Sequence, residues 1–288
     1  MNSVPYAFCE SVCGVQREFS KIYEMTEGNG TKYAIWNQAA KRMWERRLNV
    51  TISIGHSDRT WTYKITIWGE NWNDRRMLSF QEFTKLDRQH IRVTEVWIGS
   101  PILGYRTSTL EEIVEIFKFT APCVNLSFMV FCGRCTISED DLSRLSFYQN
   151  ANFRRISCYS QNRACEQFLI AQMQTSVLEI FTIAGDGSTE ELRSAIEEFA
   201  LNKDFGSIDV TSSSLVFGRA FFDALIQKPL LRKHSMFEAH FSFHSQELAT
   251  SGFQDISLPF VDRSMRWIRE DGVSVTIRHY RWLSIEFH

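Results

Sequence analysis

From residue 90 onward, apolar positions recur in a fixed order: an apolar residue, two free positions, a second apolar residue, one free position and a third. The last two members of each set are two apart, as on one face of a β-strand. The first members are separated by 25 to 31 residues, a period typical of stacked supersecondary units. The sets are Val93/Val96/Ile98, Cys123/Leu126/Phe128, Phe153/Ile156/Cys158, Leu178/Phe181/Ile183, Phe205/Ile208/Val210 and Met236/Ala239/Phe241.

Helix-start signals lie between these predicted strands. In three places a serine stands three residues before an acid, which can bond back to the cap amide and favours the helix dipole. Apolar residues at helical spacing follow, and residues 215–227 show the same spacing. Each unit is therefore predicted to be a helix followed by a short strand. The three pairs are Ser108 with Glu111, Ser138 with Asp141, and Ser188 with Glu191.

Such units can assemble in three ways. A doubly wound sheet favours a GxGxxG turn, which is absent, and a closed barrel of eight units usually needs more chain. The remaining assembly is a curved solenoid. The spacing of the apolar positions resembles irregular leucine-rich repeats, with Phe, Ile and Val in place of much of the Leu and without the repeat's Asn position. This resemblance implies an α/β fold, a leucine-rich-repeat-like solenoid over residues 90–288 with parallel strands on its concave side.

The segments that flank the repeats are predicted to cap them. Residues 48–54 and 60–68 alternate around His56–Arg59, which predicts a β-hairpin within a cap region of residues 48–89. After the repeats, residues 261–268 are predicted to be helical. Residues 273–277 and 283–287 are predicted to be strands that close the other end, because an uncapped solenoid exposes its core.

The first 47 residues are predicted to be helical. A Val-Pro step at Val4-Pro5 opens a stretch in which Phe8 and Val12 are in register, and a Gly-Asn-Gly break at residues 28–30 precedes a helix that contains Trp36. This arrangement resembles a divergent F-box, and an F-box followed by degenerate leucine-rich-like repeats resembles a family expanded in nematodes. The resemblance implies that Val4, Pro5, Phe8, Val12 and Trp36 bind the Skp-type linker of a cullin–RING ubiquitin ligase. The alternative is a helical cap on the repeats.

Charge and composition narrow the class of protein. The 288 residues carry 32 Lys and Arg against 34 Asp and Glu, which disfavours a nucleic-acid-binding protein. No signal peptide is visible, and the apolar stretch of residues 123–132 is too short to cross a membrane as a helix. We therefore expect a cytoplasmic or nuclear protein. Seven Cys at irregular spacing favour reduced, mostly buried thiols.

The sequence carries few signals of chemistry. It lacks GxSxG, HExxH and phosphate-loop motifs, and the pair Cys132/Cys135 has no second pair to complete a zinc site. Glu238, His240 and His244 fall on one face of a predicted strand, opposite a buried face of Phe237, Ala239, Phe241 and Phe243. They could form a metal or acid–base site, but a solvated sheet face explains them better. We therefore predict no enzyme, no catalytic residues, no metal and no cofactor.

The same alternation predicts the residues of the concave face. Tyr, Trp and Arg dominate binding hot spots, so this face is predicted to bind a protein partner. The predicted function is an adaptor that recruits a protein substrate to a cullin–RING ligase, and the alternative is a free-standing protein-binding module. The predicted face consists of Glu95, Trp97, Ser127, Met129, Arg155, Tyr159, Ser207, Asp209, Glu238, His240 and His244.

Overall fold

The fold is taken from a computed structural model of the chain. The sheet, the helices that cover it and the core between them are formed by residues from position 34 to the end of the chain. The structure describes residues 34–57, 60–68, 75–99, 104–132, 148, 151–159, 163–175, 177–228, 234–243, 254–256, 263–269, 272–279 and 282–288.

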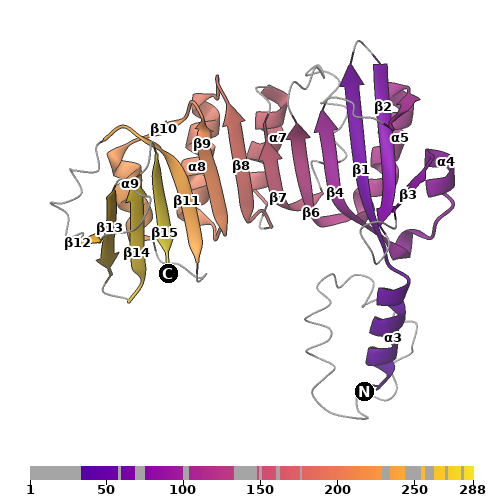
Figure 1. The fold of residues 1–288 in the computed structure, drawn as a ribbon, viewed down its shortest axis with the longest axis horizontal. Helices are drawn as coiled ribbons and strands as arrows, with labels where there is room; N and C mark the ends of the chain where they lie inside the picture. Colours follow the sequence, from indigo (N-terminus) through magenta and orange to yellow (C-terminus); the bar gives the residue numbers. More distant parts are fainter. Residues whose placement is uncertain are drawn as a thin grey trace.

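A single open β-sheet of 15 strands runs the length of the molecule (Figure 1). Its middle is a run of parallel strands that lie side by side in chain order. These strands are β1 (Leu48–Ser57), β4 (Ile91–Gly99), β6 (Val124–Cys132), β7 (Asn152–Cys158), β8 (Ile180–Gly185), β9 (Ser207–Ser213) and β11 (Ser235–Phe241).

Antiparallel strands extend the sheet beyond both ends of the parallel run. Next to β1 the order continues through β2 to β3, and β5 also pairs with β2. Next to β11 it continues through β15, β14, β13 and β12. The short strand β10 pairs with β11 in parallel. The bounds are β2 (Thr60–Trp68), β3 (Arg75–Leu78), β5 (Arg106–Ser108), β10 (Val216–Phe217), β12 (Gln254–Ile256), β13 (Arg263–Ile268), β14 (Ser274–His279) and β15 (Leu283–Phe287).

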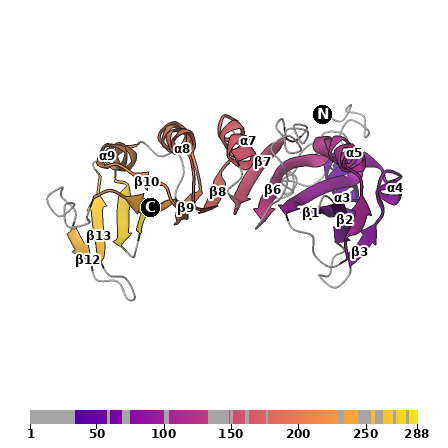
Figure 2. The same ribbon diagram turned by 90° about the horizontal axis from the view of Figure 1, so that it is seen from above.

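The helices that connect the parallel strands lie on one face of the sheet (Figure 2). They are α5 (Leu110–Thr120), α7 (Arg163–Met173), α8 (Glu190–Asn202) and α9 (Arg219–Gln227), and the short α4 (Phe80–Phe83) lies beside β3. Two 3-10 turns, η1 (Arg88–His90) and η2 (Ala121–Cys123), lead directly into β4 and β6. The hydrophobic core is the layer between these helices and the sheet.

Four of the six predicted apolar sets are confirmed as core positions. Each member of the sets on β4, β7, β8 and β9 is buried in one continuous cluster with the helices. The spacing of three and then two fits because each set includes a residue just before the strand or at a register shift, such as the one between Val93 and Glu95. Large aromatic side chains fill this layer, and edge-to-face pairs such as Phe181 with Phe199 connect strand to helix.

The set predicted on β6 is confirmed only at Cys123, which is a core residue, and it is wrong at Phe128. The core residues of β6 are Val124, Met129 and Phe131, whereas Phe128 is only half-buried and contacts Trp97 at a ring distance of 6.1 Å. Two extra residues lie in β6 between the partners of Val93 and Glu95, because Val93 pairs with Val124 and Glu95 pairs with Phe128. The register of β6 also shifts twice against β7 between Asn125 and Phe128. Val124 and Phe128 are four residues apart and only Val124 is a core residue, so the two faces of the strand exchange within this irregular stretch.

The predictions for the two ends of the chain have mixed outcomes. The hairpin of residues 48–54 and 60–68 is confirmed as β1 and β2, and the strands of residues 273–277 and 283–287 are confirmed as β14 and β15. The helix predicted over residues 261–268 is wrong, because residues 263–268 form β13 and pair with β14. Met265 and Trp267 are two apart, which suits one face of a strand.

The prediction of a leucine-rich-repeat-like solenoid is wrong. The protein is a mixed α/β fold built on one open sheet, in which strands outnumber helices among the described residues. The strands β12–β15 and β2, β3 and β5 continue the hydrogen bonding of the sheet, but they are antiparallel to their neighbours. The sheet therefore does not repeat a helix–strand unit. It also joins the two regions that were predicted to be separate, a cap of residues 48–89 and repeats of residues 90–288.

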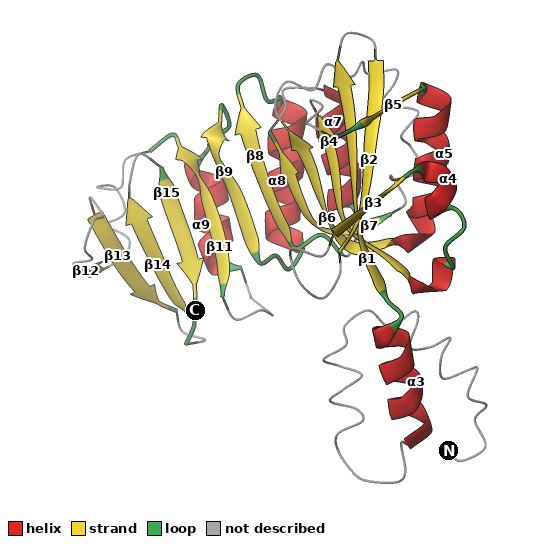
Figure 3. Ribbon diagram, turned by 45° about the vertical axis from the view of Figure 1, so that its right-hand side comes forward, coloured by secondary structure: helices red, strands yellow, loops and turns green. Residues whose placement is uncertain are grey.

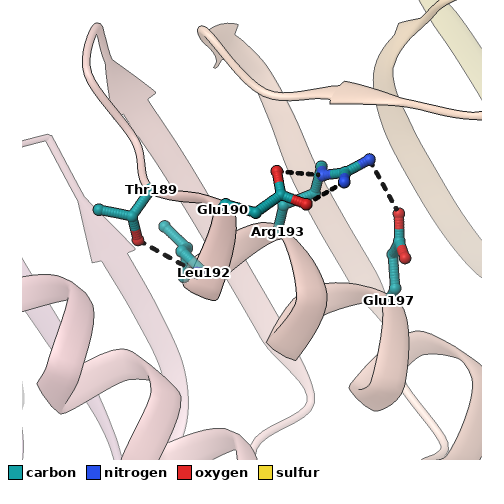
Figure 4. A network of polar contacts seen from close by, with 5 residues as sticks. All are labelled: Thr189, Glu190, Leu192, Arg193 and Glu197. Carbon is teal, nitrogen blue, oxygen red and sulfur yellow. Dashed lines mark hydrogen bonds and ion pairs between the residues drawn. The ribbon is translucent and has the colours of Figure 1, made fainter.

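The N-terminus of α8 shows how the sequence starts a helix here (Figure 4). Thr189, one residue after the predicted Ser188, is the N-cap and accepts a hydrogen bond from the Leu192 amide at 3.2 Å. The Thr189 hydroxyl also donates to a carboxylate oxygen of Glu166 on α7 at 2.8 Å, so the cap joins two helices. Arg193 pairs with Glu190 and Glu197 on the exposed side. The predicted start at Ser108 is likewise one residue early, since Thr109 caps α5.

Helix α3 (Ala34–Glu45) lies apart from the sheet, beyond the end of β1 that it leads into (Figures 1 and 3). Trp36, on this helix, is half-buried. The other residues predicted to bind a ligase linker, Val4, Pro5, Phe8 and Val12, lie outside the described residues.

Candidate functional site

The candidate site is the face of the sheet opposite α5, α7, α8 and α9, which we call the helix-distal face. Strand register brings its side chains into rows that cross the sheet, because directly paired residues point to the same side. One row runs Thr51, Glu95, Phe128, Arg155, Ile180, Ser207, Met236, Glu286. The next runs Ser53, Trp97, Val130, Ser157, Thr182, Asp209, Glu238, Ser284.

An aromatic–arginine patch, formed by Trp97, Phe128 and Arg155, crosses three adjacent strands of this face. The rings of Trp97 and Phe128 meet edge to face, and the Arg155 guanidinium carbon lies 4.8 Å from the centre of the Phe128 ring. The Trp97 indole nitrogen donates a hydrogen bond to a carboxylate oxygen of Glu95 at 3.0 Å. Arg155 is exposed, and the two rings are half-buried. The patch therefore presents oriented aromatic surface and a cation together.

The patch contains two of the predicted residues and one that the sequence reading missed. Trp97 and Arg155 were predicted on this face, whereas Phe128 was assigned to the core. Ser127 and Met129 are corrections in the opposite direction, since their side chains are 3% and 1% exposed. Met129 belongs to the core cluster, and the Ser127 hydroxyl donates to the Val93 carbonyl oxygen. The register irregularities of β6 account for all three differences.

The other end of the helix-distal face is acidic. Asp209 and Glu238 are paired across β9 and β11, and Glu286 lies on the neighbouring β15. Burial raises the pKa of the Glu238 carboxyl, and the charges of Asp209 and Glu286 raise it further, while hydrogen bonds from Ser284 and Trp282 lower it in part. Arg278 on β14 forms an ion pair with Glu286. The face thus carries an aromatic, cationic part and an acidic part.

Replacing Glu238 with glutamine is expected to stabilise the protein at neutral pH. The unfolded chain has the ordinary glutamate pKa of about 4.3, and the folded pKa is higher, so ionisation of Glu238 opposes folding as the pH rises through the folded value. Glu238→Gln removes that charge and keeps an oxygen that accepts from Ser284. Urea unfolding should show the gain at pH 7, and the gain should shrink towards about pH 4. A variant that is less stable than the wild type by the same amount at both pH values would contradict the assignment.

The remaining predicted residues are placed as follows. His240 is half-buried and its Nε2 donates to the Thr211 carbonyl oxygen at 2.9 Å. Tyr159, just beyond the end of β7, is 48% exposed, which makes it one of the more exposed large apolar side chains described. Ser207 and Asp209 are half-buried on the predicted face, and Asp209 accepts hydrogen bonds from Thr211. His244 lies outside the described residues.

Two cations elsewhere in the fold, Lys228 and Arg269, donate hydrogen bonds to the carbonyl groups at the C-terminal ends of helices. The ammonium of Lys228 donates to the Ala200 carbonyl at 2.8 Å and to the Lys203 carbonyl, and so satisfies the C-terminus of α8. Burial lowers the pKa of Lys228. Arg269 donates in the same way to the carbonyls of Ile226 and Lys228 at the end of α9.

A small pocket lies where β7 and β8 end beside α7 and α8. Glu166, Asp186 and Ser188 are among its lining residues. Ligands of open α/β sheets often bind at the carboxyl ends of strands, but the Glu166 carboxylate here is engaged by the Thr189 cap. Within the described residues, no group of three or more His, Cys, Asp or Glu is arranged to hold a metal ion.

Comparisons with protein-family models, curated proteins and solved structures found no match to this chain. Neither a family nor a relative therefore assigns a role to any of its residues. Among the described helices, none is long and apolar enough to span a membrane.

Proposed function

We propose that this protein is a protein-interaction module that binds its partner through the helix-distal face of the sheet. The observation that carries the proposal is the aromatic–arginine patch of Trp97, Phe128 and Arg155. Trp, Tyr and Arg contribute most of the energy at protein interfaces, and rings already held by neighbours lose little conformational freedom on binding. Tyr159, 48% exposed, adds a further aromatic just beyond the end of β7, the strand that contains Arg155.

The distribution of charge on this face favours a partner of complementary pattern. Arg155 is exposed on β7, and the acids Asp209 and Glu238 lie two and three strands further along the sheet. A partner that places an acidic side chain opposite Arg155 and a basic one opposite the acids gains orientation from both. Such complementarity contributes mainly to specificity and to the rate of association.

A role as a ligase adaptor is the more specific form of this proposal. In it, the N-terminal helical region holds a Skp-type linker of a cullin–RING ubiquitin ligase while the helix-distal face recruits the substrate protein. The resemblance of residues 1–47 to an F-box supports this role. The position of α3 supports it too, because α3 lies apart from the sheet, whereas a helical cap would have to cover the sheet. A free-standing binding module is the alternative.

One affinity-purification experiment tests both levels of the proposal. Wild-type protein, Arg155→Glu and a chain without residues 1–47 are used to capture proteins from cell extract, and the captured proteins are quantified. Arg155→Glu is expected to lose the partner and keep the linker. The truncated chain is expected to lose the linker and keep the partner, because the sheet begins at Leu48.

The matched control is Lys85→Glu, the same charge reversal at an exposed residue after α4. It should retain both proteins. Equal partner capture by Arg155→Glu and the wild type would contradict binding at the patch. Linker capture by the truncated chain, or its absence from wild-type protein, would leave the free-standing module as the function.

A further inference from the structure

Two histidines meet where the ends of β11 and β15 lie together. Ser235 and Phe287 are the last pair of this antiparallel ladder, and His234 and His288 are the residues directly beyond it on the two strands. The Nδ1 atoms of His234 and His288 lie 3.4 Å apart, with ring centres 5.7 Å apart.

This spacing suits two ligands of one metal ion. At 3.4 Å the two nitrogens are at the long end of the hydrogen-bond range. Two nitrogens at about 2.0–2.1 Å from a tetrahedral zinc ion lie about 3.4 Å apart. Both side chains are exposed, which leaves the remaining coordination positions open to water.

A neighbouring carboxylate prepares His288 for this role. Glu286 Oε2 lies 3.3 Å from the Nε2 atom of His288. When Nε2 carries the proton and donates it to Glu286, the lone pair of Nδ1 is directed away from that carboxylate and towards His234. Carboxylates that accept from the second nitrogen of a ligating histidine fix its tautomer and raise its basicity. Glu286 would thus act on the site without binding the metal.

We infer that His234 and His288 form a binding site for a zinc-like divalent transition metal, with Glu286 as the residue that positions His288. A metal ion bound there would link His234, the residue before β11, to His288, the residue after β15. Binding involves only coordination, and it releases whatever proton occupies either Nδ1. Imidazole ligands favour zinc and similar ions over magnesium or calcium, which prefer oxygen.

Isothermal titration of untagged full-length protein with Zn²⁺ tests the inference. The wild type is expected to bind one ion. His234→Ala and His288→Ala should each weaken that binding by at least tenfold, and Glu286→Gln by about 10-fold or more, the effect usual for such a partner of a ligand. Mg²⁺ should give no binding. Circular dichroism of the metal-free variants checks that they fold.

The matched control is His90→Ala, a histidine in η1 near the other end of the sheet, which should bind Zn²⁺ as the wild type does. The double variant His234→Ala/His288→Ala separates this site from the cysteines of the chain. Zn²⁺ binding that persists in the double variant with wild-type affinity, or no binding by the wild type, would overturn the inference.

Discussion

Phe237→Ala is expected to lower the free energy of unfolding by about 3–5 kcal/mol, the largest single loss predicted for this chain. The Phe237 side chain is 0% exposed and lies at the centre of an aromatic cluster. Its ring contacts those of Phe205, Phe217, Phe221 and Phe241 at centroid distances of 5.4 to 6.5 Å. Alanine would leave a cavity surrounded by rings from two strands, a helix and the segment before β9, and these cannot close it without moving one another.

The matched control for this experiment is Met236→Ala, its neighbour on the same strand. Met236 is half-buried and shares the helix-distal row with Ser207 and Glu286. Its loss should cost much less than the loss of Phe237 in urea or thermal unfolding. Phe241, half-buried at the rim of the cluster, should lie between the two. Equal losses for Met236→Ala and Phe237→Ala would show that the two faces of β11 are assigned wrongly.

Hydrophobic periodicity predicted the local elements of this protein well. The sets on β4, β7, β8 and β9 are all core residues, because a strand buried against helices on one face has few ways to place its apolar side chains. The hairpin of β1 and β2 followed from alternation on both sides of a polar turn. The buried thiols of Cys123, Cys158 and Cys165 also agree with the expectation from the cysteine spacing.

The assembly of these elements could not be read in the same way. Strands β3, β5, β10 and β12 are four residues or shorter, too short to carry a period of their own. The pairing of these strands and of β13 makes the sheet mixed and open. Which strand each of them pairs with depends on contacts between residues distant in the sequence. The segment Arg263–Ile268 was predicted to be a helix because it has too few apolar residues to distinguish the helical period of 3.6 from the strand period of 2.

The candidate site was predicted in part, and its errors come from one strand. Trp97 and Arg155 follow from simple alternation on β4 and β7. Phe128, which joins them, was missed because the register of β6 is irregular between Val124 and Phe128, so simple alternation does not hold there. A bulge changes the face of every later residue of the strand and leaves no clear signal in a single sequence. The cross-strand row of Glu95, Phe128 and Arg155 becomes visible only with the register.

Trp97→Ala is expected to weaken partner binding by about 30-fold, or about 2 kcal/mol, while the fold is retained. Trp97 holds the edge of Phe128 and bonds Glu95, so its loss removes the largest aromatic surface of the patch and releases its neighbours. Because Trp97 lies on the helix-distal face, the alanine variant should keep most of its thermal stability, unlike Phe237→Ala. The comparison separates a residue that binds from one that only supports the fold.

The affinity of the captured partner for Trp97→Ala, measured by calorimetry beside the wild type and Glu111→Ala, tests the central claim most directly. Glu111 is an exposed residue of α5 on the opposite side of the sheet. Binding through the helix-distal face predicts a dissociation constant about 30-fold higher for Trp97→Ala and an unchanged one for Glu111→Ala. An unchanged constant for a folded Trp97→Ala, together with weaker binding by Glu111→Ala, would place the partner on the helices and contradict the account.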